Sequence, residues 1–275
     1  MERNDVSNGA SRRGFLTKVG AATVVGVPTA AAQSGTAKSL TYQEKLDKSH
    51  KILQATNSVK KQHKFLQNRG VGITSKSTEM GLSSGDGPSV QDVKSEDLSL
   101  TFSLYTECDG REVTGFTAEM TWEYNNKYYE ASGYPPNDYA GIAWDDGSWY
   151  YANNNVDQDL YSNSPHVNYY SGSSGGGPVW EIRDVETIYE GWENDKVFYT
   201  GVDMDWKGSD PDARTIAASY SHTWSGVTVK NVSIGFPAGV SVAVGSEDKR
   251  YSKDTSDSGD FLRLRKRDAI LCSVY

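Results

Sequence analysis

The sequence predicts a mainly β protein: an antiparallel β-sandwich or jelly roll of about ten strands, preceded by one N-terminal α-helix. Two observations carry this prediction. After residue 97, apolar and polar residues alternate over many short segments, which is the period of strands with one buried face. Turn-forming residues separate these segments, and no helical pattern lies between them. A β-barrel is the structural alternative.

Three regions are expected along the 275 residues. Residues 1–32 read as a removable leader, residues 33–96 as a linker, helix and loop, and residues 97–275 as the β-sandwich domain. The net charge of −8 lacks the basic balance that phosphate binding requires, so nucleic acids are not expected partners. Residues 97–248 concentrate the acid, with 24 acids and 7 bases. Such a surface is common in salty surroundings, and equally on an ordinary soluble acidic domain.

One helix is predicted over roughly residues 41–69, because this stretch contains no Pro or Gly. Thr41 and Glu44 form a capping-box pattern at its start, and Gly70 suits its end. At about 100° per residue, the helix carries a narrow apolar stripe made of Tyr42, Leu46, Leu53 and Val59. We expect this stripe to pack on the acidic domain. A basic helix that binds a surface is the alternative.

The predicted strands follow in order. Residues 98–104 and 116–124 show the clearest alternation, and Glu119 and Glu123 in the second segment are expected to be ordinary outward-facing charges. Residues 139–144 and 148–152 are predicted to form a hairpin around Asp145-Asp146-Gly147. Further strands are predicted at 202–206, 216–224, 227–236, 240–244 and 261–265.

The leader has a characteristic order of residues. A segment with Arg12, Arg13, Phe15 and Leu16 precedes a weakly apolar run, and Ala30-Ala31-Ala32 offers a small-residue cleavage site. This order resembles a twin-arginine (Tat) signal peptide that is cleaved after Ala32. The resemblance implies that the Tat translocase exports the folded protein from a prokaryotic cell, so the location is secreted or cell-surface. No apolar run is long enough for a transmembrane helix in the mature chain.

The two cysteines stand near the first and last core strands. An exported chain permits a disulfide between Cys108 and Cys272, and two separate buried thiols are the alternative. The bridge would close a loop of about 165 residues and stabilise the fold by up to roughly 5 kcal/mol.

A polar segment places side-chain oxygens at alternate positions, in Asn153, Asn155, Asp157 and Asp159. Oxygen ligands at this spacing suggest a loop for structural Ca²⁺, and a merely polar loop is the alternative. No other cofactor is expected from the sequence.

Aromatic residues gather around the predicted hairpin, as Trp144, Trp149, Tyr150 and Tyr151. Exposed rings with amides and carboxylates nearby bind sugars, because the rings stack on apolar sugar faces while the polar groups take hydroxyls. An aromatic-rich core is the alternative. We therefore expect an exported, non-enzymatic binding module, with glycan as the candidate ligand and no catalytic residue assigned.

Two other functions remain open from the sequence. Glu181, Asp184 and Glu186 resemble the E-x-D-x-E strand of laminarinase-type glycoside hydrolases, which have a jelly-roll fold, although one extra residue turns Glu181 to the other face. That resemblance implies a secreted carbohydrate-active hydrolase. A secreted antagonist or structural surface protein is the third hypothesis. Asn231-Val232-Ser233 is an N-glycosylation sequon, which counts only if it is exposed.

Export should depend on the arginine pair, because the signal-peptide resemblance rests on it. Replacing Arg12 and Arg13 by Lys should trap the precursor inside the cell, as seen by blotting cell and medium fractions. Mature protein outside the cell in unchanged amount would contradict the Tat assignment.

Overall fold

A computed structural model describes fifteen stretches of the chain, and residues 1–38, which include the predicted leader, lie outside them. The described residues are 39–80, 98–109, 112–125, 137–144, 147–153, 156–173, 176–183, 186–187, 190–191, 196–207, 215–223, 229–235, 239–244, 252–254 and 262–265. Among them, no helix is long and apolar enough to cross a membrane.

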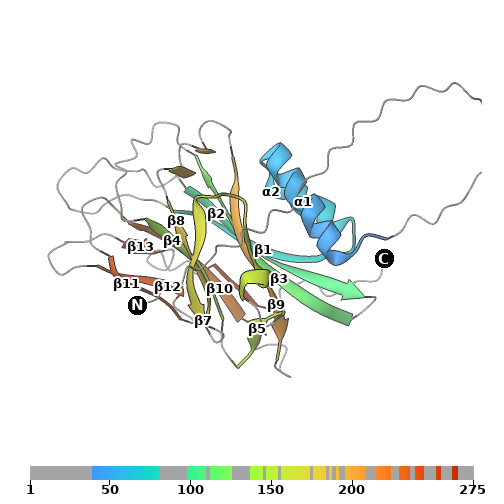
Figure 1. The fold of residues 1–275 in the computed structure, drawn as a ribbon. Helices are drawn as coiled ribbons and strands as arrows, with labels where there is room; N and C mark the ends of the chain where they lie inside the picture. The colour runs from blue at the N-terminus through green and yellow to red at the C-terminus, as the bar shows by residue number, and fades with distance from the viewer. Residues whose placement is uncertain are drawn as a thin grey trace, which may run out of the picture. The chain divides into compact units, whose positions relative to one another are not determined.

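Two antiparallel sheets dominate the fold (Figure 1), as the alternating pattern predicts. Sheet A has the order β1 (Gly72–Met80), β2 (Leu98–Asp109), β3 (Glu112–Tyr124), β9 (Phe198–Trp206) and β5 (Trp149–Tyr151), with β6 (Leu160–Ser162) also paired to β9. Sheet B has the order β13 (Ser252–Asp254), β10 (Thr215–Thr223), β4 (Asp138–Trp144), β8 (Gly177–Ile182) and β7 (Val167–Ser173), with β14 (Leu262–Arg265) also paired to β10. A two-stranded ribbon joins β11 (Val229–Gly235) to β12 (Gly239–Val244).

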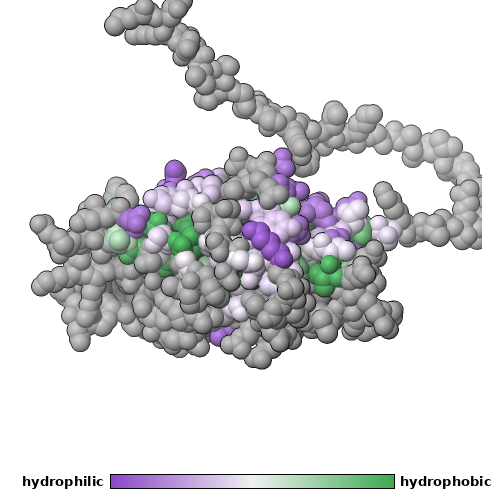
Figure 2. Space-filling model, turned by 90° about the horizontal axis from the view of Figure 1, so that it is seen from below, coloured by the Kyte–Doolittle hydropathy of each residue, from purple (hydrophilic) through white to green (hydrophobic). Residues whose placement is uncertain are grey.

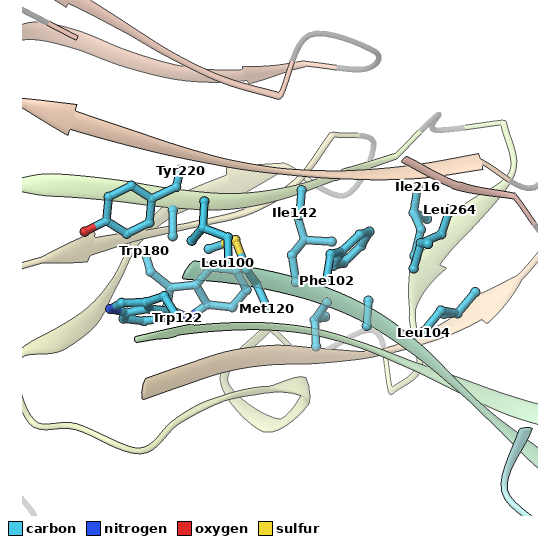
Figure 3. Packing of buried hydrophobic residues seen from close by; sticks show 14 of the residues in the cluster. Leu100, Phe102, Leu104, Met120, Trp122, Ile142, Trp180, Ile216, Tyr220 and Leu264 are labelled. Carbon is cyan, nitrogen blue, oxygen red and sulfur yellow. The ribbon is translucent and has the colours of Figure 1, made fainter. Parts of the chain in front are cut away.

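The core lies between sheets A and B. Leu100 and Phe102 of β2 and Trp122 of β3 point toward Ile142 of β4 and Tyr220 of β10 (Figure 3), and all five are at most 1% exposed. Alternate residues of each strand enter this layer, which is why the sequence has a period of two. The predicted mainly β sandwich with helix at its N-terminal side is therefore confirmed.

The single predicted helix is wrong in one respect: the segment forms two helices, α1 (Tyr42–Thr56) and α2 (Val59–Gln67). Asn57 ends α1 in the left-handed conformation with φ 46°, which Asn tolerates better than most residues. Ser58 then begins α2, because its side chain accepts a hydrogen bond from the Lys61 amide. The capping box of Thr41 and Glu44 at the start of α1 is present as predicted.

The helices and β1 belong to the same compact unit as the sandwich, which spans Leu40–Tyr275. β1 pairs with β2 along its whole length, and Leu46 and Leu66 of the helices pack with Ile73 and Tyr105 of the sheet. The boundary expected at 96/97 therefore does not separate two structural units. The helices cover the face of sheet A that points away from the core, as the packed-helix prediction requires.

The predicted hairpin across residue 147 is also wrong. β4 is a central strand of sheet B between β8 and β10, whereas β5 pairs with β9 in sheet A. The chain therefore crosses from one sheet to the other between residues 144 and 149. A short apolar run with a turn signal does not distinguish a hairpin from a crossing between sheets.

The outer face of sheet B is partly covered by the β11–β12 ribbon. Val232, Val240 and Val242 of the ribbon pack on Tyr139 and Val179. A short helical turn, α3 (Val156–Asp159), precedes β6. On the face drawn in Figure 2, hydrophobic residues are visible in only a few places, and the rest of the described surface there is hydrophilic or near neutral.

Truncating Trp149 should unfold the protein more readily than truncating its neighbour. Trp149 is 0% exposed between the sheets, so Trp149→Ala should lower the free energy of unfolding by about 3–5 kcal/mol. Tyr150 is half-buried on the other side of the strand, so Tyr150→Ala should cost about 1 kcal/mol or less. Urea titrations of both variants measure the difference. Equal losses of unfolding free energy would contradict the assignment of Trp149, and not Tyr150, to the core.

Candidate functional site

Three of the four predicted sugar-binding aromatics are core residues. Trp144 and Trp149 are 0% exposed and Tyr151 is 3% exposed, so they form no exposed platform. The ring of Trp144 meets Tyr151 edge-on at 5.3 Å, and Trp149 meets Phe116 edge-on at 5.0 Å. Their aromatic density reflects packing between the sheets, which was the alternative interpretation.

Tyr150 is the fourth predicted aromatic, and it lies partly at the surface. The ammonium group of Lys207 is 5.3 Å from the centre of its ring, a cation–π contact. A ring occupied by a neighbouring lysine is a poor stacking platform for a ligand.

The exposed aromatics lie instead on β7, which is at one edge of sheet B. Tyr169 and Tyr170 are 41% and 46% exposed, and they are the exposed large hydrophobic residues of the described chain. The β7–β8 register shifts between Tyr169 and Ser171, so Tyr170 is the extra residue of a bulge. Bulges at sheet edges re-aim side chains, and here a ring is left open to solvent.

Tyr170 stands beside a row of polar side chains on the outer face of sheet B. Asn168 of β7 is directly opposite Glu181 of β8, which is directly opposite Tyr139 of β4. The ring of Tyr170 meets that of Tyr139 edge-on, with 5.4 Å between centroids. We call Asn168, Tyr170, Glu181 and Tyr139 the tyrosine row.

The row combines the groups that recognise sugars. Burial and the nearby Glu181 carboxylate raise the pKa of Tyr139. The Glu181 carboxylate can accept hydrogen bonds from a ligand. Asn168 is exposed and Glu181 is half-buried, so both are within reach of solvent molecules.

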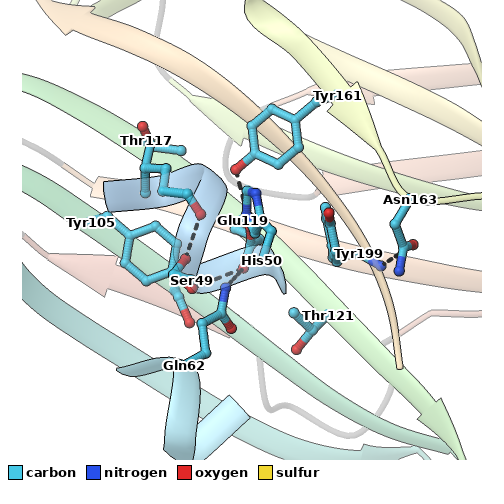
Figure 4. Close-up of polar contacts among 12 residues, drawn as sticks. Ser49, His50, Gln62, Tyr105, Thr117, Glu119, Thr121, Tyr161, Asn163 and Tyr199 are labelled. Carbon is cyan, nitrogen blue, oxygen red and sulfur yellow. Dashed lines mark hydrogen bonds and ion pairs between the residues drawn. The ribbon is translucent and has the colours of Figure 1, made fainter. Parts of the chain in front are cut away.

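A second polar centre lies under the helices, and it is closed. Glu119 of β3 is 0% exposed, which contradicts its expected outward position. Its carboxylate accepts four hydrogen bonds (Figure 4): from His50 Nε2 at 2.6 Å, Gln62 Nε2 at 2.9 Å, Tyr105 OH at 2.8 Å and Tyr161 OH at 3.1 Å. We call these five residues the Glu119 cluster. Through it, α1, α2, β2 and β6 all donate hydrogen bonds to the carboxylate of Glu119 on β3.

Gly201 allows Tyr161 to join the cluster. Gly201 is opposite both Glu119 and Tyr161 in the sheet register. A Cβ at Gly201 would lie 2.1 Å from the Tyr161 hydroxyl, so a side chain there would expel the phenol. A second contact holds α1 nearby: Tyr42 OH donates to Thr117 Oγ1 at 3.1 Å, and Thr117 donates to Asp203 at 2.6 Å.

The charges of the cluster stabilise each other. Burial alone would raise the pKa of Glu119, but the charge and hydrogen bond of His50 outweigh burial and hold it below 4.5. Burial alone would lower the pKa of His50, but the Glu119 carboxylate outweighs burial and raises it above 6.5. Between these values the two groups form a buried ion pair. A carboxylate with about four acceptor positions and four donors has none left for a substrate.

The predicted calcium loop is only partly described. The Asp159 carboxylate accepts hydrogen bonds from the Asn153 amide at 2.9 Å and from its side chain at 2.5 Å. Asn155 and the Asp157 side chain lie outside the described residues. Within the described chain, no group of three or more His, Cys, Asp or Glu is placed to hold a metal ion. The Ca²⁺ loop stays a prediction.

Of the other predicted positions, some lie within the described residues and some lie outside them. Cys108 lies on β2, but Cys272 is outside the described residues, so the disulfide stays a prediction. The leader motif and its cleavage site are outside them as well. β8 ends at Ile182, so Glu181 and Glu186 do not share one strand as the hydrolase motif requires. Asn231 is exposed on β11, which meets the condition set for its sequon.

A scan against protein-family models found no matching family, and searches of curated proteins and of solved structures also found no match. The sandwich alone does not indicate a function, because this architecture hosts many unrelated ones.

Sequence reasoning missed Tyr170, Asn168 and Glu119, although signals for them were present. The stretch from Val167 to Ser173 consists mostly of Tyr, Ser, Asn and Gly, a composition typical of binding surfaces. For Glu119 the signal was indirect. A helix with an apolar stripe needs a sheet face to cover, and the polar face of residues 116–124 was the face available.

Removing the charge of Glu119 should destabilise the protein strongly. Glu119→Gln replaces an acceptor of four hydrogen bonds and leaves the His50 charge unpaired, so we expect a loss of about 3–5 kcal/mol. Glu123, four residues along the same strand, is exposed, and Glu123→Gln should change stability by about 0.5 kcal/mol or less. Chemical denaturation of both variants at pH 6 gives the comparison.

The loss caused by Glu119→Gln should depend on pH. The lowered pKa of Glu119 gives stability that is present above pH 4.5 and disappears as pH falls through the folded value. The raised pKa of His50 gives stability that is present below pH 6.5 and disappears as pH rises through the folded value. The gap between wild type and variant should therefore be widest between pH 4.5 and 6.5. A gap that does not vary with pH would argue against a buried ion pair.

Proposed function

We propose that this chain is an exported, non-enzymatic β-sandwich protein that binds glycan outside the cell or at its surface. The observation that carries the proposal is the tyrosine row. It offers a ring that is 46% exposed, Tyr170, beside an exposed amide and a half-buried carboxylate. The export half of the proposal rests on the Tat-like leader.

The row suits a sugar for reasons of chemistry. A sugar ring has an apolar face that stacks on an aromatic ring and hydroxyls that bond to amides and carboxylates. Tyr170 supplies the ring, Asn168 and Glu181 supply the polar contacts, and the register holds those two side by side. Tyr139 supports Tyr170 through its edge-on ring contact.

The positions of the acidic residues that could serve a hydrolase favour a binding function over a catalytic one. Glycoside hydrolysis uses two carboxyl groups that face one sugar bond from either side. Glu119 is buried with four donors, and Glu181 is separated from Glu186 by the end of β8. Within the described chain, Glu181 therefore serves better as a hydrogen-bond acceptor for a bound sugar.

Tyr170→Ala should weaken binding to neutral polysaccharide without unfolding the protein. The probes are pull-downs on cellulose, chitin and insoluble β-1,3-glucan, followed by titration with the matching oligosaccharide. Loss of one stacking ring should weaken affinity about ten-fold, or roughly 1–2 kcal/mol. The melting temperature should change little, because the ring is half open to solvent.

Tyr150→Ala is the matched control, since it removes a tyrosine from a different sheet, and it should leave binding unchanged. Wild-type protein that binds none of the probes would argue against a glycan ligand. Binding that survives Tyr170→Ala but falls with Tyr150→Ala would move the site to the edge of sheet A.

A further inference from the structure

The outward face of α2 carries a group of lysines, Lys60, Lys61 and Lys64, and all three are exposed. At about 100° per residue they occupy a sector of about 100° that is centred roughly opposite Gln62 and Leu66. Those two residues are 0% exposed and hold α2 on sheet A. The orientation of α2 is therefore fixed, and the three ammonium groups are presented on one face. We call them the α2 lysines.

This arrangement disfavours the helix that carries it. Lys60 and Lys61 lie in the first turn of α2, where the positive end of the helix dipole repels cations. Lys60 and Lys64 are four residues apart, so their like charges are neighbours. α2 contains no Asp or Glu, and none of its three lysines forms an ion pair with another described residue. No protein carboxylate in the described chain therefore neutralises the α2 lysines.

α1 provides an internal comparison. Its Lys48 and Lys51 are also exposed, but Glu44 and Asp47 stand four residues before them, which is the favourable order on a helix. Residues 42–69 together carry seven Lys or Arg and two acids, in a chain whose net charge is −8. The excess positive charge is concentrated on α2, where the acids are missing.

We propose that the α2 lysines bind a linear acidic polysaccharide. Charge complementarity indicates that the ligand is an anion. The burial of the apolar side of α2 then limits which kind of anion it can be. A helix that lies in a membrane surface inserts its apolar face, but that face of α2 packs on Leu46, Ile73 and Tyr105. Single-stranded nucleic acid is held by stacking aromatics along a basic groove, and α2 exposes no large aromatic ring.

The shape of the ligand follows from the acidic surroundings. Residues 97–248 hold 24 acids against 7 bases, so a broad anionic surface would be repelled by the rest of the domain. A single polymer chain can lie along α2 and contact the lysines alone. The contact is ionic, so salt should weaken it as the screening length shortens from about 10 Å at 0.1 M to about 3 Å at 1 M.

This inference rests on the proposed function only for the location outside the cell; the site differs from the tyrosine row, and so does the ligand, which is acidic rather than neutral. The experiment uses the full mature chain and immobilised hyaluronate, with dextran as the uncharged control polymer. Affinity is measured by biolayer interferometry at 0.05 M and 0.5 M NaCl. The same protein is tested on duplex DNA and on vesicles of phosphatidylserine and phosphatidylcholine.

The variant is the triple Lys60→Gln, Lys61→Gln, Lys64→Gln, and the matched control is Lys45→Gln, Lys48→Gln, Lys51→Gln on α1. Both remove three positive charges and keep a good helix former. Wild type should bind hyaluronate at low salt, the α2 triple should bind at least about ten-fold more weakly, and the α1 triple should lose much less. The melting temperature of the α2 triple should stay the same or rise, because repulsion within the helix is removed.

Equal losses in the two triples would overturn the proposal, because net charge rather than this face would then control binding. Absence of wild-type binding to hyaluronate would overturn it as well, and so would tighter binding to DNA or vesicles. Neutral-glycan binding by the α2 triple separates this proposal from the tyrosine row. If hyaluronate binding falls as expected while wild type ignores all neutral glycans, the α2 site stands and the proposed function fails.

Discussion

The position of the helices depends on one buried carboxylate. Glu119 accepts hydrogen bonds from both helices and from two strands, and it is 0% exposed. Taking a charge out of water costs several kcal/mol, and only a full set of donors and an opposite charge offset that cost. A helix pair that shifted by one residue would take His50 and Gln62 away from the carboxylate and leave it without its opposite charge. The cluster therefore fixes the register of α1 and α2 on sheet A more narrowly than the apolar contacts of Leu46 and Leu66 do, since apolar contact is not directional.

This constraint divides the surface of the molecule. The helices cover the part of the outer face of sheet A around Glu119, so the polar residues beneath them are structural. The outer face of sheet B is only partly covered by the β11–β12 ribbon, and the bulge in β7 leaves Tyr170 open there. The sides of the helices that do not pack on the sheet face solvent. On α2 this side carries Lys60, Lys61 and Lys64 and no acid. The two proposed binding surfaces thus belong to opposite layers of one sandwich.

The sequence predicts the layers of this fold well and their contacts poorly. Period-two alternation follows directly from burial of one strand face, so β10 appears in the pattern within one residue of its true limits. The pattern also gives the start of β2 and the end of β3, although it misses the last five residues of β2 and the first four of β3. Sheet membership does not follow from local pattern, which is why residues 139–152 look like a hairpin although β4 and β5 lie in different sheets. The local pattern also does not show whether the polar face of a strand is covered by another element. Glu119 and Glu123 lie on the same face of one strand, each between two apolar residues, and only the helices above Glu119 make their burial different.

Glu119 and the α2 lysines both break a local rule, and they differ in what compensates for it. A charged residue inside a protein is unfavourable, but His50, Gln62 and the tyrosines satisfy Glu119 completely, so its presence needs no ligand to explain it. Three lysines at the start of an acid-free helix are also unfavourable, yet the described part of the chain provides no opposite charge for them. Residues that violate local preference without internal compensation are expected where a protein meets something else. By that criterion the Glu119 cluster belongs to the architecture, and the α2 lysines belong to an interaction.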